Sequence, residues 1–447
     1  MEKVRLTCIP LALPVIFLEP PDTQEPSYLV ALESKIALSR FSPFNSVKSE
    51  TMSRTPDRVT KVLVAPDKFK GSASAYRVAQ AIARGIARAT SRPHATDSST
   101  VSICIKPLAD GGEGSAEILC RAKSGQPIDA RAVDPRGRPL LAHYCIVRKS
   151  SHCVAYIDAA SASGLWLLAE GELAPRLAST YGTGLLIRDA LERHAANEVC
   201  VFVGGTATID AGLGLLQALG AVLLDDRGRP LPPNNELLHR VANIDTEPLQ
   251  RFISKHPAQL RAATDVTSPL LGPRGAVALF GPQKGVTPGE LPAFEASMLR
   301  VVQLYERLSN KSLRDVPRLG AGGGLPAALY AFLDAKIEDG FNLVAAATDF
   351  FAELQDSSWV LTGEGHLDKT SFEGKVVGRV VECAAREGCK CAIFAGIVDL
   401  PERLRESVCD VISLSSYAGS MQESIQRAEE LLVEAAAEWA SKRLLDS

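Results

Sequence analysis

The chain has 447 residues, of which 46% are apolar and 23% are charged, and its formal net charge is −3 at pH 7. This length exceeds what one hydrophobic core usually supports, so we expect two domains. The nearly neutral charge excludes the broad basic footprint of a nucleic-acid-binding protein.

Residues 1–60 differ from the rest of the chain. The apolar run Ile9–Leu18 is interrupted by Pro10 and Pro14 and is too short to span a membrane. We expect residues 1–60 to be a disordered extension or linker, with a targeting segment as the alternative. Met52 is a second possible start of the compact protein. The ten cysteines include no CxxC pair, so we expect reduced cysteines in a cytoplasmic protein.

The first predicted strand covers residues 61–66, and a charged turn follows it. Asp67, Lys68 and Lys70 lie in this turn, before a helix expected over residues 73–89. A lysine beside a helix N-terminus can pair with phosphate as a point charge. A solvated turn explains Lys68 equally well.

A second buried strand, Val101–Ile105, leads into a glycine-rich turn with two acids. Asp110 and Glu113 flank Gly111 and Gly112 in this turn, just before another predicted helix. Two acids beside an anion site fit a divalent cation that bridges them to phosphate. The alternative is a tight turn whose acids cap the helix.

Short strands around a hairpin turn are expected from residue 128 to residue 156, and another strand over Val199–Val203. Gly204, Gly205 and Thr206 follow that strand at a helix start, which is a geometry that binds oxyanions. Close helix–strand packing through glycine explains the same residues equally well. Asp210 lies four residues further on.

Two later loops, rich in glycine and proline, carry Asp265, Arg274 and Lys284. The glycine run that begins at Gly320 is not a GxGxxG fingerprint, and the chain contains no GxxxxGK[ST] loop. A nucleotide-binding enzyme with this sequence must therefore hold its phosphates in another way.

The last part of the chain returns to buried strands. Residues 359–362 form a predicted strand that ends in Gly363, Glu364 and Gly365, and Lys375 precedes the next helix. Strands at 62–65, 101–105, 359–362, 391–395 and 408–414, separated by helices, predict a doubly wound parallel α/β sheet. The middle of the chain is then an insertion between the second and third of these strands.

Five segments together resemble one enzyme family, the class I glycerate kinases of bacteria. They are APDKFKGS (65–72), ADGGEG (109–114), STYGTG (179–184), FGPQKG (280–285) and TGEG (362–365), in that order. The resemblance runs from about Lys61 to near the C-terminus. Departures include Ile209 and Ala211 around Asp210, and His366 after TGEG. These departures leave the acids of the five segments in place, so we still expect activity. They bear on which substrate the enzyme prefers.

The resemblance implies a kinase that uses ATP and Mg²⁺ to phosphorylate D-glycerate, usually giving 2-phosphoglycerate. It also implies a flavodoxin-like domain, for which we expect residues 61–127 plus 291–447, and an inserted α/β domain at residues 128–290. The active site would lie in the cleft between them. We expect small-molecule partners only, with neither nucleic acid nor membrane, and a monomer or homodimer.

Phosphoryl transfer requires in-line positioning, charge neutralisation and a group that takes the hydroxyl proton. Asp110 and Glu113 are our candidates for Mg²⁺, and Asp265 is the candidate base, with Asp210 as its rival. Candidate phosphate, nucleotide or substrate contacts are Asp67, Lys68, Lys70, Gly111, Gly112, Gly204, Gly205, Thr206, Arg274, Lys284, Gly363, Glu364, Gly365 and Lys375. Three alternatives stay open: a glycerate 3-kinase, a kinase of another small hydroxy acid, and a non-enzymatic sensor of such acids.

Overall fold

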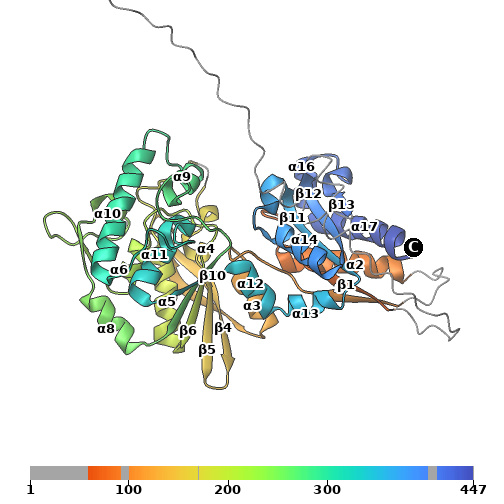
Figure 1. Cartoon of the computed structure of the whole chain (residues 1–447), viewed down its shortest axis with the longest axis horizontal. Helices are drawn as coiled ribbons and strands as arrows, with labels where there is room; N and C mark the ends of the chain where they lie inside the picture. The colour runs from red at the N-terminus through yellow and green to blue at the C-terminus, as the bar shows by residue number, and fades with distance from the viewer. Residues whose placement is uncertain (1–58, 92–99, 170, 401–409, 446–447) are drawn as a thin grey trace, which may run out of the picture. The chain divides into compact units, whose positions relative to one another are not determined.

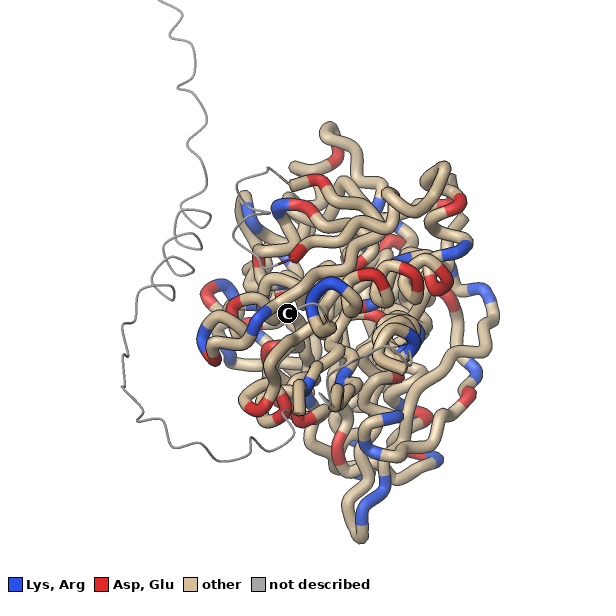
Figure 2. The backbone as a smooth tube through the Cα atoms, turned by 90° about the vertical axis from the view of Figure 1, so that its right-hand side faces the viewer, with Lys and Arg blue, Asp and Glu red and all other residues tan. Residues whose placement is uncertain are grey.

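The structure is a computed structural model that describes residues 59–91, 100–169, 171–400 and 410–445 (Figure 1). The expectations about residues 1–58 lie outside the described residues. In the described ranges, no helix is both long and apolar enough to cross a membrane. Lysine and arginine residues are interspersed with acidic residues on the side of the molecule shown in Figure 2, without a single basic stripe.

The first sheet contains five strands, all parallel, in the order β13-β12-β11-β1-β2. They are β1 (Thr60–Val64), β2 (Val101–Ile105), β11 (Trp359–Leu367), β12 (Lys390–Val398) and β13 (Asp410–Ser413). Counted within this sheet, the order is 2-1-3-4-5, which is the flavodoxin-like arrangement. The predicted fold class is therefore confirmed, and the middle of the chain is inserted between β2 and β11.

Helices cover this sheet, and α2 shows why they form. Its N-cap is Ser74, and Val78, Ile82 and Ile86 form a buried stripe at fourfold spacing. Gly85 allows α17 to approach, because a Cβ there would lie 2.5 Å from a carbonyl oxygen of α17. The helices next to this sheet in sequence are α2 (Ala75–Thr90), α13 (Phe350–Gln355), α14 (Val376–Glu387), α16 (Met421–Gln426) and α17 (Ala428–Ala440).

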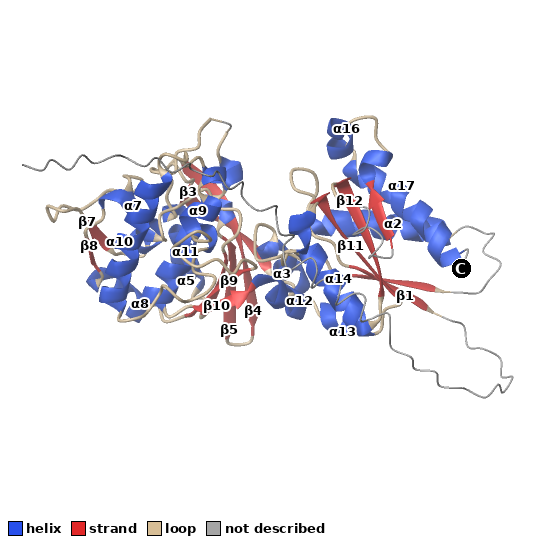
Figure 3. Cartoon of the chain, turned by 45° about the horizontal axis from the view of Figure 1, so that its top comes forward, coloured by secondary structure: helices blue, strands red, loops and turns tan. Residues whose placement is uncertain are grey.

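The second sheet has six strands in the order β10-β9-β6-β5-β4-β3 (Figure 3). Its strands are β3 (Gln126–Val133), β4 (Pro139–Lys149), β5 (His152–Asp158), β6 (Glu198–Phe202), β9 (Gln259–Thr264) and β10 (Lys336–Asp339). The pairs β3–β4 and β4–β5 are antiparallel, and the remaining pairs are parallel. A separate antiparallel pair joins β7 (Val222–Leu224) to β8 (Asn243–Asp245).

Between residues 115 and 347, the described part of the chain contains ten α-helices. They are α3 (Ser115–Ala122), α4 (Ala160–Ser163), α5 (Tyr181–His194), α6 (Leu213–Ala218), α7 (Leu237–Arg240), α8 (Glu247–Lys255), α9 (Ala276–Phe280), α10 (Leu291–Ser309), α11 (Ala321–Leu333) and α12 (Gly340–Ala347). Side chains of α5, α6, α10 and α11 share one buried core with the strands.

The second sheet extends beyond the insertion that the sequence analysis ended at residue 290. Strand β10 pairs with β9, with Ile337 opposite Ala262. Phe294 and Leu325, from the two preceding helices, also belong to the core of the second sheet. Strand β10 carries one apolar residue in four, so its sequence gave no strand signal. We propose that the boundary lies near residue 340.

Strand β11 is longer than predicted and includes the TGEG segment. Gly363 pairs with Phe394 of β12, and a Cβ on Gly363 would lie 2.2 Å from the Phe394 carbonyl oxygen. Its register with β1 is described only as far as Leu361, opposite Val64. Glu364 therefore lies where β11 continues past the end of β1.

Candidate active site

The loop after β1 lies at the switch point of the first sheet, where strand order reverses between β1 and β11. Ligands of open α/β sheets bind at such a point, outside the carboxyl ends of the strands. The Asp67 amide donates a hydrogen bond of 2.9 Å to the carbonyl oxygen of Gly363, and Asp67 Oδ1 accepts one of 2.7 Å from the Lys68 amide. The first bond attaches the start of the loop to β11, and the second is local to the loop.

Lys68 connects this loop to the glycine turn after β2. Its Nζ donates a hydrogen bond of 2.7 Å to the main-chain carbonyl of Glu113. Burial lowers the pKa of Lys68, but the carboxylates of Asp67, Asp110, Glu113 and Asp158 together outweigh burial and raise the pKa above its usual range. Burial raises the pKa of Asp67 to about 6, Lys68 opposes that rise, and Asp110 adds to it. These side chains form one electrostatic group.

Asp110 and Glu113 have carboxylate oxygens that the described residues leave free. Asp110 Oδ1 accepts a hydrogen bond of 3.0 Å from the Gly112 amide. No hydrogen bond to Asp110 Oδ2 or to the Glu113 carboxylate is found within the described ranges. The same ranges contain no group of three or more His, Cys, Asp or Glu side chains arranged to hold a metal ion. Two half-buried acids fit Mg²⁺, which usually takes one or two carboxylates together with waters and phosphate oxygens.

The glycines of this turn serve close backbone packing. Gly111 has a φ of +92°, and a Cβ there would lie 2.9 Å from Gly340 Cα. A Cβ on Gly204 would lie 2.6 Å from Gly112 Cα, and the Gly204 amide donates a hydrogen bond of 3.3 Å to the Gly111 carbonyl. The loops after β2, β6 and β10 therefore meet backbone to backbone.

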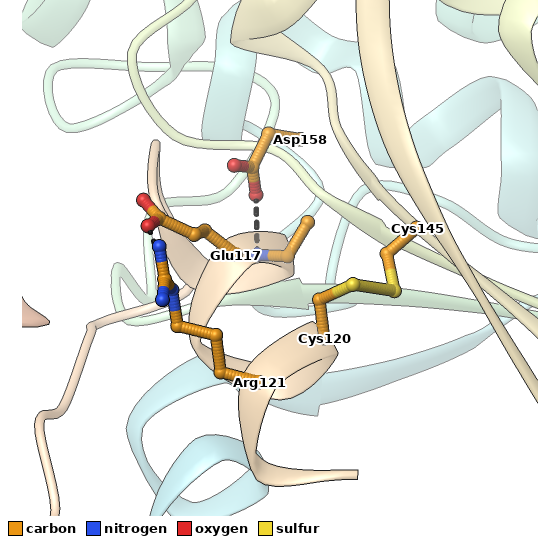
Figure 4. Close-up of a disulfide and its surroundings, with 6 residues drawn as sticks. Glu117, Cys120, Arg121, Cys145 and Asp158 are labelled. Atoms are coloured by element: carbon orange, nitrogen blue, oxygen red, sulfur yellow. Dashed lines mark hydrogen bonds and ion pairs between the residues drawn. A yellow bond between two sulfur atoms is a disulfide. The ribbon is translucent and has the colours of Figure 1, made fainter. Parts of the chain in front are cut away.

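The N-terminus of α3 is capped by a carboxylate from another strand. Asp158, at the end of β5, accepts hydrogen bonds of 2.8 Å from the Gly114 amide and 3.0 Å from the Ala116 amide. Figure 4 shows the Asp158 carboxylate above the start of α3. Burial raises the pKa of Asp158 to about 6, whereas the two amide donors lower it. The Gly114 and Ala116 amides at the start of α3 are thus already paired within the chain. The sequence analysis did not single out Asp158. The signal for it was an acid at the end of a buried strand.

A disulfide joins α3 to β4 beside this cap. Cys120 and Cys145 are bonded, with 5.7 Å between their Cα atoms (Figure 4). The expectation of reduced cysteines is therefore wrong for this pair. The two residues are 25 apart in sequence, and only the packing of α3 on β4 brings them together.

Glu364 and Lys375 lie near Asp67. Burial raises the pKa of Glu364 to about 7, and Asp67 raises it while Lys375 lowers it. Glu364 Oε1 is buried, and no described residue pairs with it by a hydrogen bond. Lys375 Nζ donates a hydrogen bond of 2.6 Å to Thr370 Oγ1. An unpaired buried oxygen is costly unless a ligand pairs with it, so Glu364 is well suited to bind a donor group.

Asp265 directly follows β9. Burial raises its pKa to about 7, and the nearby carboxylates of Asp110 and Asp339 raise it further. Arg318 Nη1 donates hydrogen bonds to the carbonyl oxygens of Thr264 and Asp265, at 2.8 and 3.3 Å. A carboxyl with a pKa near 7 can accept a proton at physiological pH. The sequence analysis missed Arg318 and Asp339.

Lys284 is almost completely buried, with 3% of its surface exposed. Its Nζ donates hydrogen bonds of 3.2 Å to Thr206 Oγ1 and 2.9 Å to the carbonyl oxygen of Thr208. Burial lowers the pKa of Lys284 to about 7, against a smaller rise caused by Asp210. Thr208 Oγ1 is buried and unpartnered next to this lysine.

Both carboxylate oxygens of Asp210 accept hydrogen bonds. Its Oδ2 accepts hydrogen bonds from the Thr180 amide at 2.8 Å, the Thr180 hydroxyl at 2.9 Å and the Gly214 amide at 3.2 Å. Its Oδ1 accepts one of 3.1 Å from the Gly212 amide. These bonds tie the starts of α5 and α6 together.

The remaining candidates are spread over the two sheets. Lys70 and Arg274 are exposed, and Gly205 has a φ of +76° while its carbonyl accepts a hydrogen bond from the Leu165 amide. Gly365 packs against the backbone of the loop after β1: a Cβ there would lie 3.3 Å from the Lys70 amide nitrogen. No hydrogen bond or ion pair of the Arg274 side chain is found among the described residues.

A cavity of about 870 Å³ opens beside the Lys68 group. Four predicted site residues line it: Asp67, Lys68, Lys70 and Glu113. Its other lining side chains include Tyr76, Arg77, Arg121, His143, Tyr144, Asp158 and Trp166, together with the disulfide. Its size is within the range of small-molecule and cofactor sites. Asp110, Asp265, Lys284 and Glu364 are not part of its lining.

The chain is similar in sequence and in fold to known glycerate kinases. The chain is 34% identical to glycerate kinase from Halalkalibacterium halodurans over 84% of this chain and 96% of that protein. It is also 34% identical to glycerate 2-kinase from Escherichia coli K12, over 82% of this chain and 94% of that protein. A crystal structure of a candidate glycerate kinase 2 from Salmonella typhimurium LT2 superposes with a TM-score of 0.70 at 32% identity, covering 86% of this chain and 98% of that one.

The family model described as the glycerate kinase family matches residues 62–443, which include all of the second sheet, the first sheet from Val62 onward and every candidate site residue. With relatives of this identity and coverage, and with the flavodoxin-like sheet already established, the chain belongs to the glycerate kinase family.

Proposed function

We propose that this protein transfers the γ-phosphoryl group of MgATP to a hydroxyl group of D-glycerate, giving 2-phosphoglycerate. The observation that carries the proposal is the gathering of acids and a charged lysine at the carboxyl ends of β1, β2 and β11, beside a cavity of suitable size. Phosphoryl transfer depends mainly on positioning and charge neutralisation, and these groups suit both tasks.

Asp265 is our proposed base for the glycerate hydroxyl. Its raised pKa of about 7 supports this role, since a base should titrate near the working pH. Asp210, the rival, has both oxygens engaged in hydrogen bonds to backbone and hydroxyl donors. We therefore propose a structural role for Asp210.

Asp110 and Glu113 are the proposed holders of Mg²⁺. Their free carboxylate oxygens and the adjacent Lys68 ammonium support a site for a cation together with phosphate oxygens. When bound, Mg²⁺ would neutralise the charge on the phosphates. Lys68 remains charged and holds the Glu113 turn through its main-chain carbonyl.

Lysine and arginine side chains would bind the anionic parts of the two substrates. We propose that Lys284, with Thr206, binds the glycerate carboxylate or a phosphate, because no carboxylate of the described residues lies within hydrogen-bonding distance of its buried Nζ. Lys70 and Lys375 would contact phosphates, and Arg274 would contact the carboxylate from its exposed loop.

A coupled assay tests this proposal. Full-length protein with MgATP and D-glycerate should release ADP, and its product should be a direct substrate for enolase, which acts on 2-phosphoglycerate. ADP release without enolase conversion would instead identify a glycerate 3-kinase. If a folded sample released no ADP, the proposal would be wrong, and a kinase of another hydroxy acid or a small-acid sensor would replace it.

A further inference from the structure

Arg318 has a backbone conformation that an arginine rarely adopts. Its φ is +73°, in the left-handed region where a Cβ clashes with the following carbonyl. Such strain persists only when the surrounding structure enforces it, and it gathers at functional sites. The segment around Arg318 runs along the loop after β9: the Arg318 amide donates to Thr267 O at 3.4 Å, and the Gly320 amide donates to Ser268 O at 3.0 Å.

The guanidinium group of Arg318 bridges the ends of two neighbouring strands. Nη1 donates to the carbonyl oxygens of Thr264 and Asp265, which follow each other at the end of β9. Nη2 donates a charge-assisted hydrogen bond of 3.0 Å to Asp339 Oδ2, at the end of β10. Its side chain is 21% exposed, so these contacts are partly shielded from water.

From these contacts we propose that Arg318 is a positioning residue that fixes the Asp265 peptide, and with it the direction of the Asp265 carboxylate. The inference rests on the proposed function, in which Asp265 accepts the hydroxyl proton. The left-handed backbone is the conformation that lets one side chain reach three oxygens on two strands. A displacement of about 1 Å in a catalytic group can cost about 100-fold in rate.

Arg379 provides a comparison within the same cluster. It donates to Asp339 Oδ2 at 3.4 Å and to Asn342 Oδ1 at 2.8 Å. It makes no hydrogen bond to the Asp265 peptide. If charge compensation of Asp339 were the whole role of Arg318, removing either arginine would have similar effects. If Arg318 positions Asp265, its removal should have the larger effect.

The decisive variant is Arg318→Gly, because glycine accepts a φ of +73° without strain and removes the guanidinium. We expect an unchanged or higher melting temperature and a fall in kcat of about tenfold or more, with the KM for MgATP changed less than about twofold. Arg318→Lys keeps the charge but loses the two-pronged donor, and should give an intermediate kcat. The matched control is Asn310→Gly, which relieves a φ of +56° at the end of α10 and should leave kcat unchanged.

Amide hydrogen exchange gives a readout that needs no activity. Exchange at residues 263–268 should become faster in Arg318→Gly and stay unchanged in Asn310→Gly. An unchanged kcat in an active enzyme, or unchanged exchange in this segment, would overturn the inference. Absence of ADP release by the wild-type protein would contradict the proposed function instead, and the exchange measurement would still decide whether Arg318 holds the loop.

Discussion

Replacing Lys284 with methionine should change stability by an amount that depends on pH. The burial that lowers the pKa of Lys284 from 10.5 to about 7 corresponds, at about 1.4 kcal/mol per unit, to a cost of about 5 kcal/mol for the charged form. Below pH 7 both the folded and the unfolded states bind the proton, and the folded state bears the whole cost. Between pH 7 and 10.5 the unfolded state binds more protons, so the wild-type protein gains stability as pH rises.

Methionine removes this pH-dependent cost and also removes the hydrogen bonds to Thr206 and Thr208. Leaving those acceptors unpaired costs about 1–3 kcal/mol each at every pH. Lys284→Met should therefore be most favourable to stability at low pH. Between about pH 6.5 and 9.5 its effect relative to wild type should move by about 3 kcal/mol toward destabilisation.

Thermal unfolding of the full-length protein at the two pH values measures this change. If the domain with the second sheet unfolds as a unit of about 200 residues, about 2–4 °C per kcal/mol applies, and the difference in melting temperature between variant and wild type should move by roughly 6–12 °C. Lys123→Met is the control, because Lys123 is exposed and should show no such movement. A Lys284→Met effect that is the same at both pH values would refute the reasoning, since Lys284 would then stay charged throughout. In the coupled assay of ADP release, Lys284→Met should also raise the KM for ATP or for glycerate.

Other variants test the neighbouring parts of the site. Asp110→Asn should lower kcat by orders of magnitude with an unchanged melting temperature, and near-normal turnover would remove Asp110 from the metal site. Cys120→Ala, or reduction of the bond to Cys145, should destabilise the protein by about 3 kcal/mol for a loop of this length, and thiol counting before and after reduction verifies the bond. Asp158→Ala should cost about 1 kcal/mol, because two amides at the start of α3 lose their acceptor; an unchanged melting temperature would contradict that capping role.

The first sheet could be predicted because its signals are local. Each strand is a short apolar run followed by a turn with glycine or acids, as at Val101–Ile105, and such runs alternate with helix patterns. Strand β10 carried no such signal, since Ile337 is its one apolar residue and its pairing with β9 comes from tertiary packing. For this reason the sequence offers no ground for placing the end of the insertion near residue 340, where we propose it.

Several side chains of the site act through contacts that sequence patterns do not encode. The left-handed backbone of Arg318 leaves no signature, because sequence patterns anticipate glycine or asparagine there. The glycine turn after β2 was predicted, but its use in packing against Gly204 and Gly340 depends on loops far away in the chain. A glycine needed for close packing looks the same in sequence as one that approaches a ligand.

The two candidate bases, Asp210 and Asp265, differ in the groups that surround their carboxylates. Asp210 and Asp265 both lie in short loops after buried strands, and both have raised pKa values because of burial. Four hydrogen bonds hold Asp210 to donors at the starts of two helices, so a proton taken up there would break them. The pKa of Asp265 is raised first by burial and then by the carboxylates of Asp110 and Asp339, against backbone hydrogen bonds from its own amide and that of Val266, so taking up a proton there also relieves repulsion. An acid whose protonation relieves repulsion is the better base, and that distinction depends on which groups the fold brings around it.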